Sequence, residues 1–128
     1  MILIDTSAWI EFFRGKSSTS ESVGEAITGN DAALCGAVVT ELRRGLRSTR
    51  ERRRVLPLLE GCHRLSQPSD VWEEAGDLGF FLARKGITAK SMDLLIATYA
   101  LAHGAALLTL DADFAAMKRA GVGLVLVD

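Results

Sequence analysis

The chain has little cysteine, little proline and no long hydrophobic run, and each scarcity excludes a class of protein. Its two cysteines, Cys35 and Cys62, match neither a disulfide framework nor a metal-ligand spacing, so both are expected to be core thiols. Only 2 prolines, together with 48% hydrophobic residues, exclude a disordered chain. No apolar run approaches the roughly 18 residues that a membrane-spanning helix needs. We therefore expect a globular protein without a membrane segment.

The first residues also lack the features of a signal peptide. The sequence MILIDTSAW has no basic residue before its apolar run, and it reaches an acidic residue at position 5. The expected localisation is therefore the cytoplasm. Domains of about 100 to 150 residues are the commonest size. The 128 residues are accordingly expected to form a single domain, 1–128.

Neither sign of charge is in excess overall, but the arginines are unevenly distributed. A formal net charge of −1 argues by itself against nucleic acid as a partner. Nearly half of the basic residues, however, lie in one short stretch that is opposed only by Glu51: Arg43, Arg44, Arg47, Arg50, Arg52, Arg53 and Arg54. This arginine-rich stretch is either a contact for an RNA backbone or a solvated helix face, and the sequence favours neither.

Short apolar runs alternate with helical patterns along the chain. The expected strands are residues 1–4, 32–36, 62–66, 105–110 and 122–127. The expected helices are residues 8–14, 20–28, 40–45, 49–60, 71–85, 91–103 and 111–120. Apolar strands that alternate with helices are typical of a parallel sheet covered on both faces. The predicted fold class is therefore α/β, a three-layer α/β/α sandwich with a parallel sheet of four or five strands.

Acidic residues occur where such a fold places its binding site. Asp5 directly follows the first expected strand, Glu41 lies in the first turn of the helix after the second, and Asp111 with Asp113 follows the strand at 105–110. Asp93 lies at the start of a helix that is apolar almost all round. Open α/β sheets bind ligands beyond the carboxyl ends of their strands, near the point where the strand order reverses. We expect these carboxylates to face one common edge.

Each acid taken singly has a plainer interpretation. Asp5 and Asp111 suit helix N-caps, and Glu41 and Asp93 suit the positive end of a helix dipole. Taken together they need a cation, because two carboxylates about 4 Å apart repel by about 4 kcal/mol at an effective dielectric of roughly 20. Oxygen ligands without Cys or His suit Mg²⁺ or Mn²⁺, which also bind phosphate oxygens. The chemistry indicated is phosphodiester hydrolysis.

Four segments resemble the PIN-domain nucleases, and within them the VapC toxins of toxin–antitoxin pairs. The family N-terminus is similar to MILIDTSAWIEFFRG, and the segment with its glutamate is similar to VVTELRRG. The segment with its third acid is similar to MDLLIATYALAHGA, and its terminal motif to LLTLDADF. These segments occur in the family's order and span almost the whole chain.

The resemblance implies a magnesium-dependent endoribonuclease, in which Mn²⁺ can replace Mg²⁺. It implies that Asp5 and Asp93 bind the metal directly and that Glu41 and one terminal acid complete the pocket. That terminal acid is Asp111 or Asp113, and we favour Asp111 because it lies nearer the strand end. In the implied mechanism a metal-activated water attacks the RNA phosphodiester, so no nucleophilic side chain is needed.

Three hydroxyl residues lie close to these acids in the sequence, namely Thr6, Ser7 and Thr109. Each is a candidate to orient a carboxylate or a phosphate, and each suits helix capping equally well.

The resemblance also implies partners. VapC-like proteins are homodimers inhibited by a VapB-like antitoxin, whose C-terminal segment packs along a groove of the toxin and places a basic side chain among the acids. Such a cation would relieve the repulsion between the carboxylates. The helix with Trp9, Ile10, Phe12 and Phe13 is more apolar than one buried face requires, and we expect part of it to receive the antitoxin.

Other protein classes fit the acids less well. Phosphoaspartyl phosphohydrolases place a second Asp two residues after the first, where this chain has Ser7. Receiver domains need an Asp after the third strand, where this chain has Leu65 and Ser66. The remaining alternative is a catalytically inactive PIN-like module that only binds RNA or a partner. The presence of all four acids argues against it.

Overall fold

Four short parallel strands form the centre of the fold in a computed structural model that describes residues 1–128. They are β1 (Ile2–Ile4), β2 (Ala32–Leu34), β3 (His63–Arg64) and β4 (Ala106–Leu108). Their order across the sheet is β3-β2-β1-β4, and all neighbouring pairs are parallel. Because β2 and β4 flank β1 on opposite sides, the strand order reverses at β1, which is where α/β sheets bind ligands.

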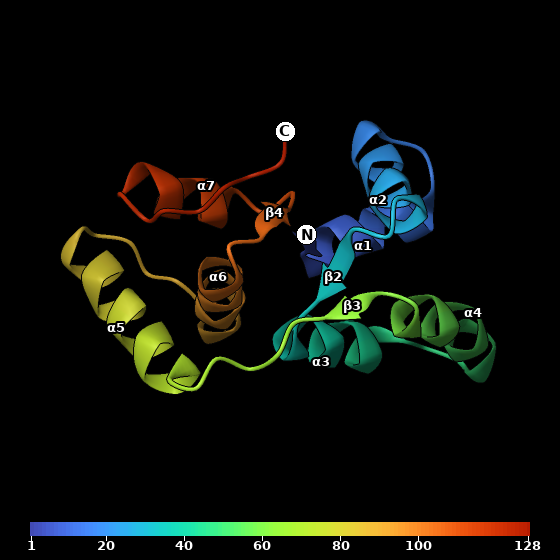
Figure 1. Cartoon of the computed structure of the whole chain (residues 1–128), viewed down its shortest axis with the longest axis horizontal. Helices are drawn as coiled ribbons and strands as arrows, with labels where there is room; N and C mark the ends of the chain where they lie inside the picture. The colour runs from blue at the N-terminus through green and yellow to red at the C-terminus, as the bar shows by residue number, and fades with distance from the viewer.

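Seven helices connect and cover these strands. They are α1 (Thr6–Arg14), α2 (Ser18–Thr28), α3 (Gly36–Gly45), α4 (Thr49–Glu60), α5 (Val71–Arg84), α6 (Ser91–His103) and α7 (Ala112–Arg119). Figure 1 shows α1 and α2 on one side of the sheet and α5 and α6 on the other. The predicted α/β/α sandwich with a parallel sheet is confirmed, with four strands. None of the helices combines the length and hydropathy that crossing a membrane requires.

One hydrophobic core joins the three layers. Its fully buried side chains come from the strands, such as Leu3 and Leu107, and from the helices on both sides, such as Trp9, Ile96 and Phe114. Strands β1, β2 and β4 are almost entirely buried, so mainly their ends are in contact with solvent. The residues that directly follow the strands are therefore held in fixed positions at one edge of the sheet.

Two helices have the bounds that the sequence predicts, namely α4 and α6. Helix α2 begins at Ser18 rather than at Ser20, because the hydroxyl of Ser17 caps it by accepting a hydrogen bond from the backbone N–H of Ser20 at 3.1 Å. The start of α2 was predicted two residues too late, because the serines at positions 17, 18 and 20 suit a loop and a helix cap equally well.

The predicted start of the third helix is wrong. Helix α3 begins at Gly36 rather than at Thr40, so Glu41 lies in its second turn and not in its first. Valines such as Val38 favour strands in a sequence pattern. Here Val38 is fully buried in the core, and this packing outweighs its weak preference for an extended backbone.

The predicted last strand is also wrong as a regular element. Residues 122–127 make a single parallel bridge, between Leu107 and Leu126, so only one residue pair adds to the edge of β4. The backbone N–H of Leu124 donates to the carbonyl of Val122 at 2.8 Å. This tight turn interrupts the extended backbone that a longer ladder would need.

Helix α5 differs from its sequence pattern in which apolar residues it buries. It buries Val71, Ala75 and Leu82 against the core. Trp72 and Phe81 share the helical spacing of this pattern, yet they are exposed to 62% and 40%. The pattern therefore located the helix correctly but overestimated its buried face.

Candidate active site

Asp5 lies at the carboxyl end of β1, where the strand order reverses. The residue is 4% exposed, and its Oδ2 accepts hydrogen bonds from the hydroxyls of Ser7 and Thr109, each at 2.8 Å. Although Asp5 occupies the N-cap position of α1, its side chain makes no capping hydrogen bond. The carboxylate is thus held in place by two hydroxyls. This confirms that Ser7 and Thr109 orient a carboxylate.

The two hydroxyls are themselves held by the segment that follows β4. The oxygen of Ser7 accepts the backbone N–H of Leu110 at 3.0 Å, and that of Thr109 accepts the backbone N–H of Asp111 at 3.0 Å. Each hydroxyl therefore donates to Asp5 and accepts from the backbone, which uses both kinds of hydrogen-bonding capacity of an O–H group. The network fixes the position of Asp5 relative to Asp111.

Glu41 reaches the same edge of the sheet from α3. Its Oε1 accepts a hydrogen bond from the hydroxyl of Thr6 at 2.7 Å. Because Thr6 directly follows Asp5 in the chain, this bond anchors Glu41 beside the end of β1. Thr6 therefore also orients a carboxylate, as the third of the predicted hydroxyl residues.

Asp93 is the most strongly perturbed of the acids. It lies in the first turn of α6 and is 8% exposed, and its Oδ2 is buried without any hydrogen-bond partner. The pKa of Asp93 is raised from 3.8 to about 6, mainly by burial and also by the negative charges of four other acids: Asp111, Asp5, Asp113 and Glu41. Buried polar atoms almost always have a partner. The orphaned oxygen of Asp93 thus indicates a site for a cation.

The last two acids lie at the start of α7. Asp111 is the N-cap, and its Oδ1 accepts the backbone N–H of Asp113 at 2.9 Å. Asp111 is therefore both a helix cap, as its plainer interpretation proposed, and a member of the acidic cluster. One carboxylate oxygen from each of Asp93, Asp111 and Asp113 lies within 4.8 Å of the others.

An open pocket of about 370 Å³ unites four of the five predicted acids. Its walls include Asp5, Glu41, Asp93 and Asp111, whereas the exposed Asp113 lies beside the pocket and not in its wall. One charged wall residue was not predicted from the sequence. It is Lys90, which is the basic side chain in the wall of this pocket. Its only signal in the sequence is its position three residues before Asp93.

These residues fit a divalent cation. They offer several carboxylate oxygens, one of them buried and unpartnered, and neither a thiolate nor an imidazole lines the pocket. Oxygen-only sites of this kind suit hard cations such as Mg²⁺ and Mn²⁺. A cation here would offset the repulsion that raises the pKa of Asp93.

A second hollow, of about 400 Å³, adjoins the acidic pocket and shares Thr6, Ile10 and Glu41 with it. We call it the α1–α3 groove. It is lined by apolar side chains, Ile10, Phe13, Leu42, Leu46 and Val55, and by charged ones, Arg14, Arg47, Glu41 and Glu51. Of the aromatic residues of α1, Phe13 lines this groove, whereas Trp9 is fully buried in the core.

Comparison with known proteins agrees with this fold. The family model for the PIN domain matches residues 2–120, and the chain therefore belongs to the PIN domain family. It is 33% identical to ribonuclease VapC11 of Mycobacterium tuberculosis over 125 residues, which is 93% of this chain and 92% of the relative. It is equally similar to VapC ribonuclease Mb1587 of Mycobacterium bovis, with the same identity and coverage.

A solved structure of similar fold is the DNA-bound VapBC of Salmonella typhimurium. The TM-score is 0.79 at 21% identity, and the match covers 99% of this chain and 96% of the other. VapBC2 of Rickettsia felis gives a TM-score of 0.78 at 22% identity, covering 99% and 98% of the two chains. At this level of identity the likeness confirms the fold.

Proposed function

We propose that this chain is an endoribonuclease that hydrolyses RNA phosphodiester bonds with the help of Mg²⁺, and that it is the toxin of a toxin–antitoxin pair. The observation that carries the proposal is the buried, unpartnered oxygen of Asp93 in a pocket with Asp5, Glu41 and Asp111. The relatives named VapC ribonucleases support the activity. The location of the pocket at the reversal of strand order supports the site.

The acids have different roles in this proposal. Asp5 and Asp93 would hold the cation directly, because both carboxylates are nearly buried at the pocket wall. Glu41, bonded to Thr6, and Asp111 would complete the pocket through water. Of the two terminal acids we assign the role to Asp111, because it lines the pocket. Asp113 would be an outer acid that adds negative charge.

The chain itself would position the reacting groups. A bound divalent cation would supply an activated water and stabilise negative charge on the phosphate in the transition state. Ser7 and Thr109 hold the carboxylate of Asp5 through Oδ2, so its orientation is set before RNA binds. Lys90 is the cation in the wall and would attract the phosphate backbone towards the acids.

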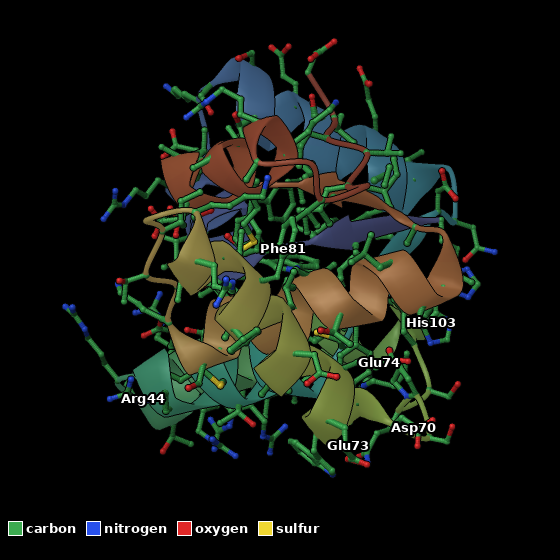
Figure 2. All side chains as sticks on the ribbon, turned by 90° about the vertical axis from the view of Figure 1, so that its left-hand side faces the viewer. Arg44, Asp70, Glu73, Glu74, Phe81 and His103 are labelled. Carbon is green, nitrogen blue, oxygen red and sulfur yellow. The ribbon has the colours of Figure 1, made fainter.

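The arginine-rich stretch supplies the remaining positive charge for RNA. It covers the end of α3 and the first half of α4, and all seven of its arginines are exposed and without a salt bridge. Figure 2 shows Arg44 pointing away from the body of the protein. Such side chains would contact phosphates and position the substrate without reading its sequence.

The activity is tested by removing and restoring the metal. We expect the protein to cleave single-stranded or looped RNA in Mg²⁺, to lose cleavage in EDTA, and to regain it in excess Mg²⁺ or Mn²⁺. The reason is that the carboxylates repel one another and also repel the RNA phosphate, unless a cation neutralises their charge. Gel analysis of end-labelled RNA measures cleavage directly.

Ca²⁺ provides the control for this experiment, because it occupies oxygen sites with looser geometry than Mg²⁺. RNA that is bound but not cut with every one of these ions would contradict the proposed activity. The inactive RNA-binding module would then be the better interpretation.

The α1–α3 groove is the proposed site of a VapB-like antitoxin. It combines an apolar lining with charged side chains and runs into the acidic pocket through Ile10 and Glu41. A peptide lying in it could cover apolar surface and present a cation to the carboxylates. The solved VapBC complexes of similar fold support a partner of this kind.

Co-expression tests this partner. We expect the gene that adjoins this one to encode a short protein that co-purifies with the chain, and Ile10→Glu to reduce that co-purification at least about tenfold. A buried charge costs several kcal/mol, whereas Ile10 in the free protein is 44% exposed and tolerates the change. Val125→Glu is the matched control, because Val125 is 63% exposed and lies outside the groove. Equal co-purification of both variants would exclude the groove as the site.

A further inference from the structure

A third hollow, of about 500 Å³, lies where the end of α1 meets the start of α2. We call it the α2 hollow. It shares no residue with the acidic pocket, and no apolar side chain lines it. Its walls are formed by Gly15, Lys16, Ser17, Ser18, Ser20 and Glu21. Such a lining suits a small polar ligand and not an apolar one.

The most buried residue of the α2 hollow is Ser20, which is 8% exposed and lies in its wall. The backbone N–H of Ser20 donates to the hydroxyl oxygen of Ser17 at 3.1 Å, whereas the hydroxyl of Ser20 itself has no partner within the chain. Buried hydroxyls almost always have a hydrogen-bond partner, because an unpaired one lowers stability. The free hydroxyl of Ser20 therefore indicates that a polar group binds in the hollow.

The first turn of α2 offers further donors at the same place. The backbone N–H groups of Ser20 and Glu21 are satisfied by the hydroxyl and the carbonyl of Ser17. Those of Ser18 and Thr19 have no partner within the chain, as is usual at the start of a helix. Free N–H groups at the positive end of a helix dipole favour an anion.

Two side chains of opposite charge border the α2 hollow. Lys16 is exposed and supplies an ammonium group that attracts anions, and the exposed carboxylate of Glu21 repels them. Backbone N–H groups can only donate, so they suit an anion and cannot bind a cation. A phosphate group has several acceptor oxygens, so it can bind Lys16, the Ser20 hydroxyl and the free N–H groups together.

Helix α1 connects this hollow to the acidic pocket. Thr6 at its start lines the acidic pocket, Arg14 at its end lines the α1–α3 groove, and Gly15 begins the α2 hollow. The 9 residues of α1 rise by roughly 13 Å. About four nucleotides of a stacked strand, at roughly 3.4 Å each, span this distance.

We propose that the α2 hollow binds a backbone phosphate of the RNA whose scissile phosphate lies at the acidic pocket, about four nucleotides away. The preference for a phosphate rests on the hollow alone. The choice of RNA as its source rests on the proposed function. A phosphate held in the hollow would position the strand along α1 and would make binding depend on the length of the RNA.

Titration of the full, ¹⁵N-labelled chain with inorganic phosphate tests the hollow without RNA. The amide signals of Ser18 and Thr19 are expected to shift until they saturate. Ser20→Ala should weaken this binding at least about threefold, because it removes a hydrogen bond to a charged group. The same variant should melt at the same temperature or higher, because alanine favours the helix and removes an unpaired hydroxyl. A purely structural role of Ser20 would give the opposite change in melting temperature.

Charge variants test the sign of the bound ion. Lys16→Gln should weaken phosphate binding and Glu21→Gln should strengthen it, each at least about threefold, whereas a bound cation would reverse both effects. Lys118→Gln is the matched control, because Lys118 is exposed in the last turn of α7, which Figure 1 shows on the opposite side of the molecule from α2. Unshifted amide signals, or variants that all behave like Lys118→Gln, would overturn the site.

RNA binding in the Asp5→Asn background, in which cleavage is suppressed, tests the source of the phosphate. Lys16→Gln should weaken binding of an RNA of about eight nucleotides and lower its salt slope by about 0.7, the value for one phosphate contact on a single strand. It should leave binding of a dinucleotide unchanged, because a dinucleotide cannot reach both sites. Inorganic phosphate binding without this difference would overturn the assignment to RNA. If the hollow binds phosphate but the wild type cleaves no RNA, the proposed activity fails and the phosphate site stands.

Discussion

Replacing Asp5 by Asn is expected to reduce RNA cleavage at least about 100-fold, because the lost carboxylate would otherwise hold the cation that stabilises charge in the transition state. The fold should survive this change. The Asn side chain keeps a carbonyl oxygen that can accept the hydrogen bonds from Ser7 and Thr109, which now bind Oδ2 of Asp5 at 2.8 Å. Cleavage rates under single-turnover conditions, together with circular dichroism and thermal melts, separate lost activity from lost structure.

Glu60→Gln is a control for the removal of one negative charge, because Glu60 is exposed and lies just before β3, at the edge of the parallel sheet opposite to the site. Thr109→Val should give a smaller loss than Asp5→Asn, since it removes an orienting hydrogen bond and leaves the carboxylate in place. Full cleavage by Asp5→Asn would show that the cation is held elsewhere.

Asp93→Asn is expected to stabilise the metal-free protein at neutral pH by about 3 kcal/mol, although it should abolish metal-dependent cleavage. The pKa of Asp93 is raised from 3.8 to about 6 in the folded protein, mainly because burial disfavours its charged form. The folded state therefore favours the protonated group. The wild-type free energy of unfolding should fall, relative to the variant, as the pH rises from about 4 through 6, and remain lower above that range.

Chemical denaturation in EDTA at several pH values measures this difference. Subtracting the wild-type free energy of unfolding from that of Asp93→Asn removes the pH dependence that both proteins share. Saturating Mg²⁺ should then stabilise the wild type more than the variant, because at one ligand concentration a ligand that binds more tightly stabilises the folded state more. A difference that does not vary between pH 4 and pH 8 would contradict the assignment of the raised pKa to Asp93.

Asp93→Asn is thus expected to raise the stability of the metal-free protein and to abolish its activity. Its carboxylate is nearly buried, lacks a hydrogen-bond partner at Oδ2 and stands among other acids. Such an arrangement destabilises the free protein. A bound cation would relieve the repulsion between the carboxylates, and this relief would strengthen its binding. Functional sites are commonly less stable than the fold that holds them.

The α/β fold could be predicted because its signals are local. Most helices and strands are indicated by the apolar spacing within them. The bounds of α4 follow from the cap Ser48 and from Gly61, and the end of α6 follows from Gly104. The acids of the site could be identified for a related reason. Asp5 directly follows β1 and Asp111 lies three residues after the end of β4, and the ends of parallel strands meet at one edge of the sheet whatever the detailed packing.

Other features could not be predicted because they depend on residues that are distant in the chain. Helix α3 includes Val38 because the core buries it, and a local pattern of valines does not contain that information. The last strand is missing because a turn at Leu124 interrupts it. Phe80 and Trp72 have the hydrophobicity of core residues, and only the placement of α5 against α6 decides that they face solvent.

The sequence by itself indicated the order of the seven helices and the four strands, the family and the acids proposed for the site, since these depend on side-chain type and spacing along the chain. Tertiary structure alone decided that three hydroxyls orient Asp5 and Glu41, that Asp93 is buried without a partner, and that Asp111 rather than Asp113 lines the pocket. The physical reason is that hydrogen bonding and desolvation act over a few ångströms in space. Their partners are 35 and 104 positions apart in the chain for the bonds of Thr6 and Thr109, and only the folded backbone brings them together.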